Sequence, residues 1–161
     1  MISQEFQFEA PSTLNEALAL LDRHGEDAKV LSGGMSLVPV MTLGLLETDM
    51  IISLNHIEEL VGVREDRETL RIGALTTHDE VATNPIIREH APLLADAAEM
   101  IGDVQIRNRG TLGGSIAHAD PAADYLPVAL VLGARFHLKS RGGERTVDAK
   151  DFFQGLMMTA L

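Results

Sequence analysis

The chain has 161 residues, of which 45% are hydrophobic and 23% are charged, and its formal net charge is −11 at pH 7. A chain of this length forms one domain or two small lobes, and its negative charge argues against nucleic acid and anionic membranes as partners, because both require clustered Lys and Arg. The sequence has no cysteine, so this chain cannot form disulfides or ligate an iron–sulfur cluster.

The first residues and the hydropathy of the chain indicate a cytoplasmic protein. The segment MISQEFQFEAP contains acidic residues and lacks the apolar core that a signal peptide needs. No apolar run approaches the roughly 20 residues that a membrane-spanning helix requires. A membrane span is therefore not expected.

The beginning of the chain predicts a strand followed by a helix. Phe6 and Phe8 alternate with polar residues, which indicates a short strand. Thr13 and Glu16 have the spacing of a capping box, in which a threonine and a glutamate satisfy the first free N–H groups of a helix. Gly25 is placed to end that helix.

Two further apolar segments complete a predicted βαβ lobe over residues 1–56. The first, residues 28–31, is expected to be a strand that leads directly into a Gly-Gly turn and then a helix beginning near Ser36. The second, residues 51–54, is expected to be another strand.

Residues 57–161 are predicted to form a larger lobe of hairpins and short helices. Strand-like segments joined by charged or glycine-rich turns predict hairpins, and capping boxes or first-turn prolines predict helices. The predicted segments are strands at 61–64 and 69–74, helices beginning at 77 and 92, a helix over 122–132, and strands at 134–140 and 145–147. The expected fold class is α+β, with His78 and His90 on solvated helix surfaces.

Two glycine-rich segments have the composition of anion-binding turns. The first glycine motif is Ser32-Gly33-Gly34-Met35-Ser36, and the second is Thr111-Leu112-Gly113-Gly114-Ser115, which follows Arg107 and Arg109. Glycine permits positive φ and lets an anion approach backbone N–H groups without a Cβ in the way. If the two motifs converge, they can hold a pyrophosphate, with the arginines adding local positive charge. Purely structural turns are the alternative, because no GxGxxG or GxxxxGK[ST] pattern occurs.

His118, Asp120 and Asp124 raise the alternative of a metal site. Their spacing matches no standard set of metal ligands, and the segment from Asp120 to Asp124 has the composition of a turn that caps the following helix. No metal site is therefore expected. No catalytic residue is expected either, since the chain has no cysteine nucleophile and no recognisable arrangement of serine, histidine and acid.

Four segments resemble, in order and spacing, the FAD-binding (medium) subunits of molybdenum hydroxylases, the family of aerobic carbon monoxide dehydrogenase and xanthine dehydrogenase. They are VLSGGMSLVPVM (30–41), LRIGALTTHDEV (70–81), IRNRGTLGGSIAHADPAADYLP (106–127) and DFFQGLMMTAL (151–161). The resemblance implies a fold of the vanillyl-alcohol-oxidase type, with an N-terminal lobe at 1–56, a central lobe at 57–161, and FAD between them. It also implies a C-terminal domain that is absent here, so the chain is interpreted as a truncated family member.

The resemblance assigns FAD contacts to particular positions. It places the pyrophosphate on the first glycine motif (Ser32, Gly33, Gly34, Met35 and Ser36), with the second (Thr111, Leu112, Gly113, Gly114 and Ser115) closing on it. Asp124 falls in the same site, and Ile101 falls where the family packs an apolar or aromatic side chain near the cofactor. Met35 and Gly44 depart from the family pattern, which usually has a polar residue and an arginine at these positions.

The resemblance also implies a role in electron transfer. In the family, electrons released at a molybdopterin cofactor on a large subunit pass through [2Fe–2S] clusters on a small subunit, reach FAD on the medium subunit, and leave to an external acceptor. The expected assembly is a dimer of heterotrimers, and the lack of cysteine fits this division of labour. One alternative is a FAD-free scaffold that keeps the fold for subunit contacts. Another is a stand-alone flavin oxidase, although no context for a covalent flavin link is present.

Overall fold

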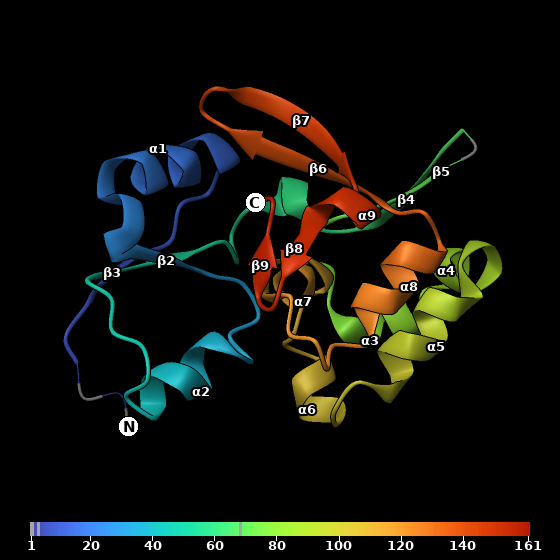
Figure 1. Cartoon of the computed structure of the whole chain (residues 1–161), viewed down its shortest axis with the longest axis horizontal. Helices are drawn as coiled ribbons and strands as arrows, with labels where there is room; N and C mark the ends of the chain where they lie inside the picture. The colour runs from blue at the N-terminus through green and yellow to red at the C-terminus, as the bar shows by residue number, and fades with distance from the viewer. Residues whose placement is uncertain (1, 3, 68) are drawn as a thin grey trace.

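The computed structural model describes residues 2, 4–67 and 69–161, which form a mixed arrangement of helices and short strands (Figure 1). The N-terminal elements, blue to teal in Figure 1, gather on one side, and the helices of the following hundred residues gather on the other. Each group surrounds its own cluster of buried hydrophobic side chains.

The N-terminal group is built on a parallel three-stranded sheet. Strands β1 (Gln7–Glu9), β2 (Ala28–Leu31) and β3 (Met50–Ser53) are arranged in the order β1-β3-β2. All four residues of the central strand β3 are buried, as expected for a strand that is paired on both edges and covered by other elements. Because the strands are parallel, the segments that leave their carboxyl ends lie at one edge of the sheet.

Helix α1 (Leu14–His24) follows the predicted capping box and packs against β3. The Thr13 side chain accepts a hydrogen bond from the Glu16 amide, and the Glu16 carboxylate accepts one from the Thr13 amide. This reciprocal pair satisfies N–H groups that no helical carbonyl can reach. The apolar face of α1 contributes to the smaller core, which contains Ala17, Ala28, Met50, Ile52 and Ile57.

Short helical segments flank the sheet strands. A 3₁₀ turn, η1 (Gly25–Asp27), joins α1 to β2, and helix α2 (Leu37–Thr42) begins after the first glycine motif. A second 3₁₀ turn, η2 (Glu58–Leu60), leads away from the sheet. The first glycine motif therefore connects the carboxyl end of a strand to the start of a helix.

The larger group consists of short helices enclosed by hairpins. Its elements in chain order are β4 (Val63–Asp66), β5 (Thr69–Ile72), α3 (His78–Thr83), α4 (Pro85–His90), α5 (Pro92–Met100), α6 (Val104–Arg107), α7 (Leu112–His118), α8 (Tyr125–Val131), β6 (Arg135–Ser140), β7 (Gly143–Asp148), α9 (Ala149–Phe152), β8 (Phe153–Gly155) and β9 (Met158–Thr159). Strand pairs β4–β5, β6–β7 and β8–β9 are each antiparallel. Within the described part of the chain, no helix is both long enough and apolar enough to cross a membrane.

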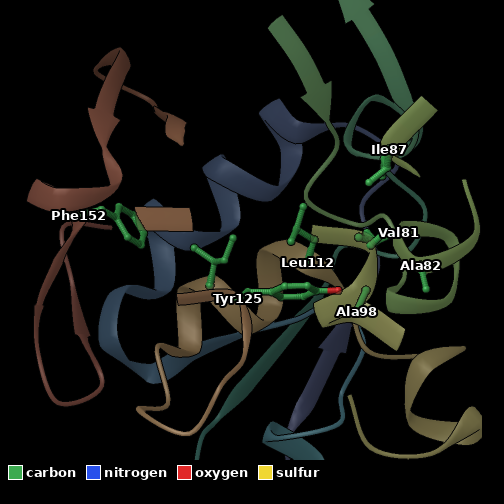
Figure 2. Close-up of a cluster of buried hydrophobic side chains, with 9 residues drawn as sticks. Val81, Ala82, Ile87, Ala98, Leu112, Tyr125 and Phe152 are labelled. Carbon is green, nitrogen blue, oxygen red and sulfur yellow. The ribbon is translucent and has the colours of Figure 1, made fainter. Parts of the chain in front are cut away.

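The core of this larger group draws on residues far apart in the sequence. Its buried members are Val81, Ala82, Ile87, Ala95, Ala98, Leu112, Ile116, Tyr125 and Phe152. Figure 2 shows the Tyr125 ring extending among the side chains of Leu112, Val81 and Ala98. Leu112 belongs to the second glycine motif, so that motif is anchored in the core by its own apolar residue.

The α+β class predicted from the sequence is confirmed, but several local predictions were wrong. The short helices α4, α6 and α9 were not among the predicted segments, and the second glycine motif begins a helix where a loop was expected. Asp120 accepts a hydrogen bond from the Ala122 amide, as the predicted turn requires. Asp124 occupies the N-cap position of α8, yet its side chain makes no capping hydrogen bond.

Candidate functional site

The first glycine motif presents backbone donors that the protein does not use. Gly34 has φ of 77°, a conformation that costs glycine little and other residues more. In the described part of the chain, the amides of Gly33, Gly34, Met35 and Ser36 donate no hydrogen bond to the protein. Successive N–H groups in such a turn form a concave, partly positive surface that suits an anion.

The second glycine motif uses its backbone donors within the protein. The Leu112 amide donates to the Thr76 carbonyl at 3.0 Å, and the Gly113 amide donates to the Ala74 carbonyl at 2.8 Å. The Gly114 amide donates to Thr111 Oγ1 at 3.2 Å, which makes Thr111 the N-cap of α7. These three amides are already paired before any ligand is considered.

Close packing explains the two glycines of the second motif. Neither Gly113 nor Gly114 has a positive φ, contrary to the conformational role expected from the sequence. A Cβ on Gly113 would lie 2.5 Å from the Ala74 Cβ, and a Cβ on Gly114 would lie 2.6 Å from Ser32 Oγ. Both distances are far below van der Waals contact, so only glycine lets these neighbours approach.

The two motifs touch each other across the two halves of the molecule. A Cβ on Gly33 would overlap the Arg109 carbonyl oxygen and would lie 2.7 Å from the Gly110 Cα. The Thr111 hydroxyl donates to Ser32 Oγ at 3.1 Å, which joins residues that are 79 positions apart. The structure therefore brings together the two segments that the sequence singled out.

In the hydrogen bond between the two motifs, Thr111 is the donor and Ser32 is the acceptor. Thr111 Oγ1 accepts the Gly114 N–H and donates its own proton to Ser32 Oγ. A serine hydroxyl can accept one hydrogen bond and still donate another. The Ser32 proton is consequently available beside the unpaired amides of the first motif.

The other predicted site residues occupy different surroundings. Ile101 is half-buried and packs against the larger core, and Ser115 is half-buried on α7. Asp124 is exposed at the start of α8. Arg107, expected to add positive charge, instead donates from its guanidinium to the carbonyls of Ile101 and Gly102.

Sequence reasoning missed a buried polar pair behind the second motif. His78, expected on a solvated surface, is 5% exposed, and its Nδ1 lies 3.0 Å from the Tyr125 hydroxyl. Burial lowers the pKa of His78 to about 4, so the imidazole is neutral at physiological pH. Burial and the nearby Asp124 carboxylate raise the pKa of Tyr125, which keeps the phenol protonated. The spacing of His78, Val81 and Ala82 on one helical face was the available signal.

Other parts of the surface are less suited to binding a metal ion or a phosphate. Among the described residues, no three His, Asp or Glu side chains are placed to hold a metal ion, and this covers His118, Asp120 and Asp124. An open depression near the start of α1 is lined by Ser12, Asn55, His56, Glu58, Glu59 and Val61. Its two glutamates make it a poor place for a phosphate in an acidic protein.

Comparison with protein families gives a match over nearly the whole chain. Residues 4–161 match the family described as the FAD binding domain in molybdopterin dehydrogenase. The matched range includes both glycine motifs and the buried pair behind the second one.

Relatives and solved structures agree with the family match. The chain is 45% identical over 161 residues to the carbon monoxide dehydrogenase medium chain of Hydrogenophaga pseudoflava, covering 100% of this chain and 56% of the relative. It is 39% identical over 159 residues to the glyceraldehyde dehydrogenase medium chain of Sulfolobus acidocaldarius, covering 99% and 56%.

A solved structure of the Hydrogenophaga pseudoflava carbon monoxide dehydrogenase, lacking the Mo-pyranopterin moiety of its cofactor, superimposes with a TM-score of 0.98. The match has 45% identity and covers 100% of this chain and 56% of the solved chain. This chain therefore spans little more than half the length of the relatives it matches.

Proposed function

Because the chain belongs to the family of FAD binding domains in molybdopterin dehydrogenases, we propose that it holds FAD non-covalently, with the pyrophosphate at the contact between the two glycine motifs. The observation that carries the proposal is the set of unpaired amides at Gly33, Gly34, Met35 and Ser36. Oriented amides can hold a phosphate against an unfavourable overall charge because they act at hydrogen-bonding distance.

The two glycine motifs are proposed to contribute different groups to the pyrophosphate site. The first motif supplies backbone donors, and the Ser32 hydroxyl adds a donor because Thr111 already donates to its oxygen. The second motif supplies the opposing wall, with the Ser115 hydroxyl as its contribution to the ligand. Its amides at Leu112, Gly113 and Gly114 hold α7 in place and are not proposed as phosphate donors.

Two further residues are proposed to contact other parts of FAD. Asp124 is exposed and makes no capping bond, so its carboxylate is free to accept hydrogen bonds from hydroxyl or amino groups of the cofactor. Ile101 is proposed to offer apolar surface near the cofactor. No residue of this chain is proposed as a general acid or base, because bound FAD supplies the redox chemistry.

The lobe organisation is proposed to follow from this binding mode. We assign residues 1–56 to an N-terminal FAD-binding lobe and residues 57–161 to a central one, in a fold of the vanillyl-alcohol-oxidase type. Support comes from the separate hydrophobic clusters on the two sides of the motif contact. FAD would then lie between the lobes, where Gly33 meets Gly110.

The whole protein is proposed to be the flavoprotein subunit of a cytoplasmic molybdenum hydroxylase. In that role it receives electrons from [2Fe–2S] clusters on a small subunit, supplied by a molybdopterin cofactor on a large subunit, and passes them to an external acceptor. The proposed assembly is a dimer of heterotrimers. A FAD-free scaffold is not favoured, because a scaffold has no use for a row of unpaired amides between its lobes.

Analysis of the cofactor tests this proposal. The complex containing the full-length chain is purified and denatured, and the released flavin is identified by chromatography and mass. We expect one FAD per copy of this chain. Release of FMN, or of no flavin from a complex that contains its iron–sulfur and molybdopterin subunits, would contradict the proposal. Native mass measurement on the same sample tests the subunit composition.

A further inference from the structure

The buried histidine His78 lies directly behind the contact between the two glycine motifs. A Cβ added to Gly110 would lie 2.5 Å from His78 Nε2 and 2.6 Å from His78 Cδ2. The imidazole therefore occupies the place that a side chain at residue 110 would take. Any larger side chain at residue 110 would overlap the His78 ring, so this position requires glycine.

Gly110 also packs against the first motif. A Cβ on Gly33 would lie 2.7 Å from the Gly110 Cα. The Arg109–Gly110 backbone thus packs against both the Gly33 backbone and the His78 ring. Protein interiors are close-packed, so displacing the ring would allow or force movement of this backbone.

Two sets of contacts fix the position of the ring. The His78 amide donates to the Gly110 carbonyl at 3.0 Å, and an isolated antiparallel bridge pairs Thr77 with Thr111. From the other side, the Tyr125 hydroxyl lies 3.0 Å from Nδ1, with the two ring centroids 5.3 Å apart. Tyr125 is fully buried and directly follows Asp124 at the start of α8.

We propose that His78 is a positioning residue for the flavin site, whose imidazole, fixed by the Tyr125 hydroxyl, sets how closely the second glycine motif approaches the first. This inference rests on the proposed function, since the site being positioned is the FAD pyrophosphate site. His78 does not touch the ligand. It acts through Gly110 on Gly33.

A directional hydrogen bond explains why a histidine serves here. An apolar side chain could fill the same space, but only dispersion contacts would then set its orientation. The bond to Tyr125 fixes the ring plane relative to α8, and therefore relates the segment carrying Asp124 to the glycine contact. The neutral imidazole can be buried in this way because its Nδ1 is paired with the Tyr125 hydroxyl.

The first test removes the hydrogen bond and keeps the volume. In the full-length complex depleted of FAD, Tyr125→Phe should weaken FAD binding about tenfold, as measured by quenching of flavin fluorescence, because the ring loses its anchor. The matched control is Ile87→Val, a fully buried core change on α4. It should lower the melting temperature and leave the FAD dissociation constant unchanged.

The second test uses size compensation. Gly110→Ala alone should abolish tight FAD binding, because the added methyl group overlaps the His78 ring. In a His78→Ala background the methyl group has space, so the double variant should bind FAD more tightly than Gly110→Ala alone. Such rescue identifies the ring as the group that sets the position of Gly110.

The outcomes distinguish the positioning role of His78 from the proposed binding of FAD. The positioning role is overturned if Tyr125→Phe lowers only the melting temperature, as Ile87→Val does, or if His78→Ala gives no rescue of Gly110→Ala. In both cases an unmodified complex that binds FAD leaves the proposed function standing. An unmodified complex that does not bind FAD overturns both.

Discussion

The two glycine motifs share a Gly-Gly pair and neighbouring hydroxyl residues, but they differ in whether their backbone N–H groups are paired within the protein. In residues 32–36 the N–H groups donate no hydrogen bond to the described part of the chain, and Gly34 adopts a positive φ. In residues 111–115 the N–H groups of the first helical turn are paired to Ala74, Thr76 and Thr111. The first motif therefore leaves its donors free for the ligand that we propose, whereas the second uses its donors within the protein.

The neighbours of each motif produce this difference. The second motif runs beside residues 74–77, where the carbonyls of Ala74 and Thr76 accept hydrogen bonds from its amides. The first motif leaves the sheet at the carboxyl end of β2 and packs on the Arg109–Gly110 backbone, yet no carbonyl in the described part of the chain accepts a hydrogen bond from its amides. A glycine pair alone thus indicates close approach, and the destination of its backbone hydrogen bonds decides whether the approaching group is a ligand or the protein.

The largest expected effect comes from separating the motifs at Gly33. Gly33→Ala would place a methyl group against the Arg109 carbonyl and Gly110, so the amides could no longer face a common ligand. Losing two hydrogen bonds to phosphate, at about 1.5–3 kcal/mol each, should weaken FAD binding by two to four powers of ten. Titration of the FAD-depleted complex measures this.

The control for Gly33→Ala is Gly142→Ala in the β6–β7 turn. A Cβ on Gly142 would have only the Ser140 hydroxyl near it, at 3.7 Å. FAD affinity should be unchanged in this variant. Tight FAD binding by Gly33→Ala would show that the close contact of the motifs is dispensable.

Amide hydrogen exchange should separate the motifs directly. In the FAD-depleted complex, the amides of Gly34, Met35 and Ser36 should exchange at least about a hundredfold faster than those of Leu112 and Gly113, because only the latter are hydrogen-bonded within the fold. Adding FAD should slow the first set much more than the second. Equal protection of both sets without FAD would contradict the contrast between the motifs.

Acid should destabilise the folded chain through protonation of the buried His78, which lies behind the second motif. The pKa of His78 is about 4 in the folded chain and 6.5 when it is exposed, so between these values the unfolded state binds the extra proton. This contribution to stability is complete above pH 6.5 and is lost as the pH falls toward 4, by up to about 3 kcal/mol. Tyr125 and Asp124 are the titratable groups on the adjoining helix.

Denaturant unfolding at pH 7 and pH 4.5 measures this loss. His78→Gln, which cannot take up a proton, should lose less stability than the unmodified chain over the same interval. His90→Gln is the matched control, because His90 is exposed and its side chain pairs with the exposed Glu65 carboxylate. If all three proteins show the same pH dependence, the burial of His78 has no energetic consequence.

Gly113→Ala should act on stability more than on the ligand. The new methyl group would lie 2.5 Å from the Ala74 Cβ, and such overpacking costs about 2 kcal/mol. Thermal unfolding should show the loss, while the first motif keeps its donors and FAD affinity falls less than in Gly33→Ala. A larger loss of affinity in Gly113→Ala than in Gly33→Ala would reverse the roles assigned to the two motifs.

The smallest effect is expected from Ser115→Ala. One hydroxyl is removed while the Ser115 amide still donates to the Thr111 carbonyl within α7. A single hydrogen bond to a charged phosphate contributes at least about 1.5 kcal/mol, so FAD affinity should fall about tenfold. Unchanged affinity would remove Ser115 from the ligand contacts and leave the second motif with a purely structural role.

Local sequence patterns were sufficient for part of this molecule. The capping box at Thr13 predicted α1, alternation at Phe6 and Phe8 predicted β1, and four ordered motifs led to the family. The first two of these signals lie within a few residues, because capping and strand periodicity depend on near neighbours along the chain. Both glycine motifs were found in the same way.

The use of each motif was decided only by contacts between distant residues. Nothing near Gly113 in the sequence indicates that its amide meets Ala74, and nothing near Ser32 indicates Thr111, which lies 79 residues away. His78 was predicted to lie on a solvated helix surface, and it is buried because α8 brings Tyr125 against it. Burial and hydrogen-bond pairing are properties of the packed structure, so they follow from which segments the fold brings together.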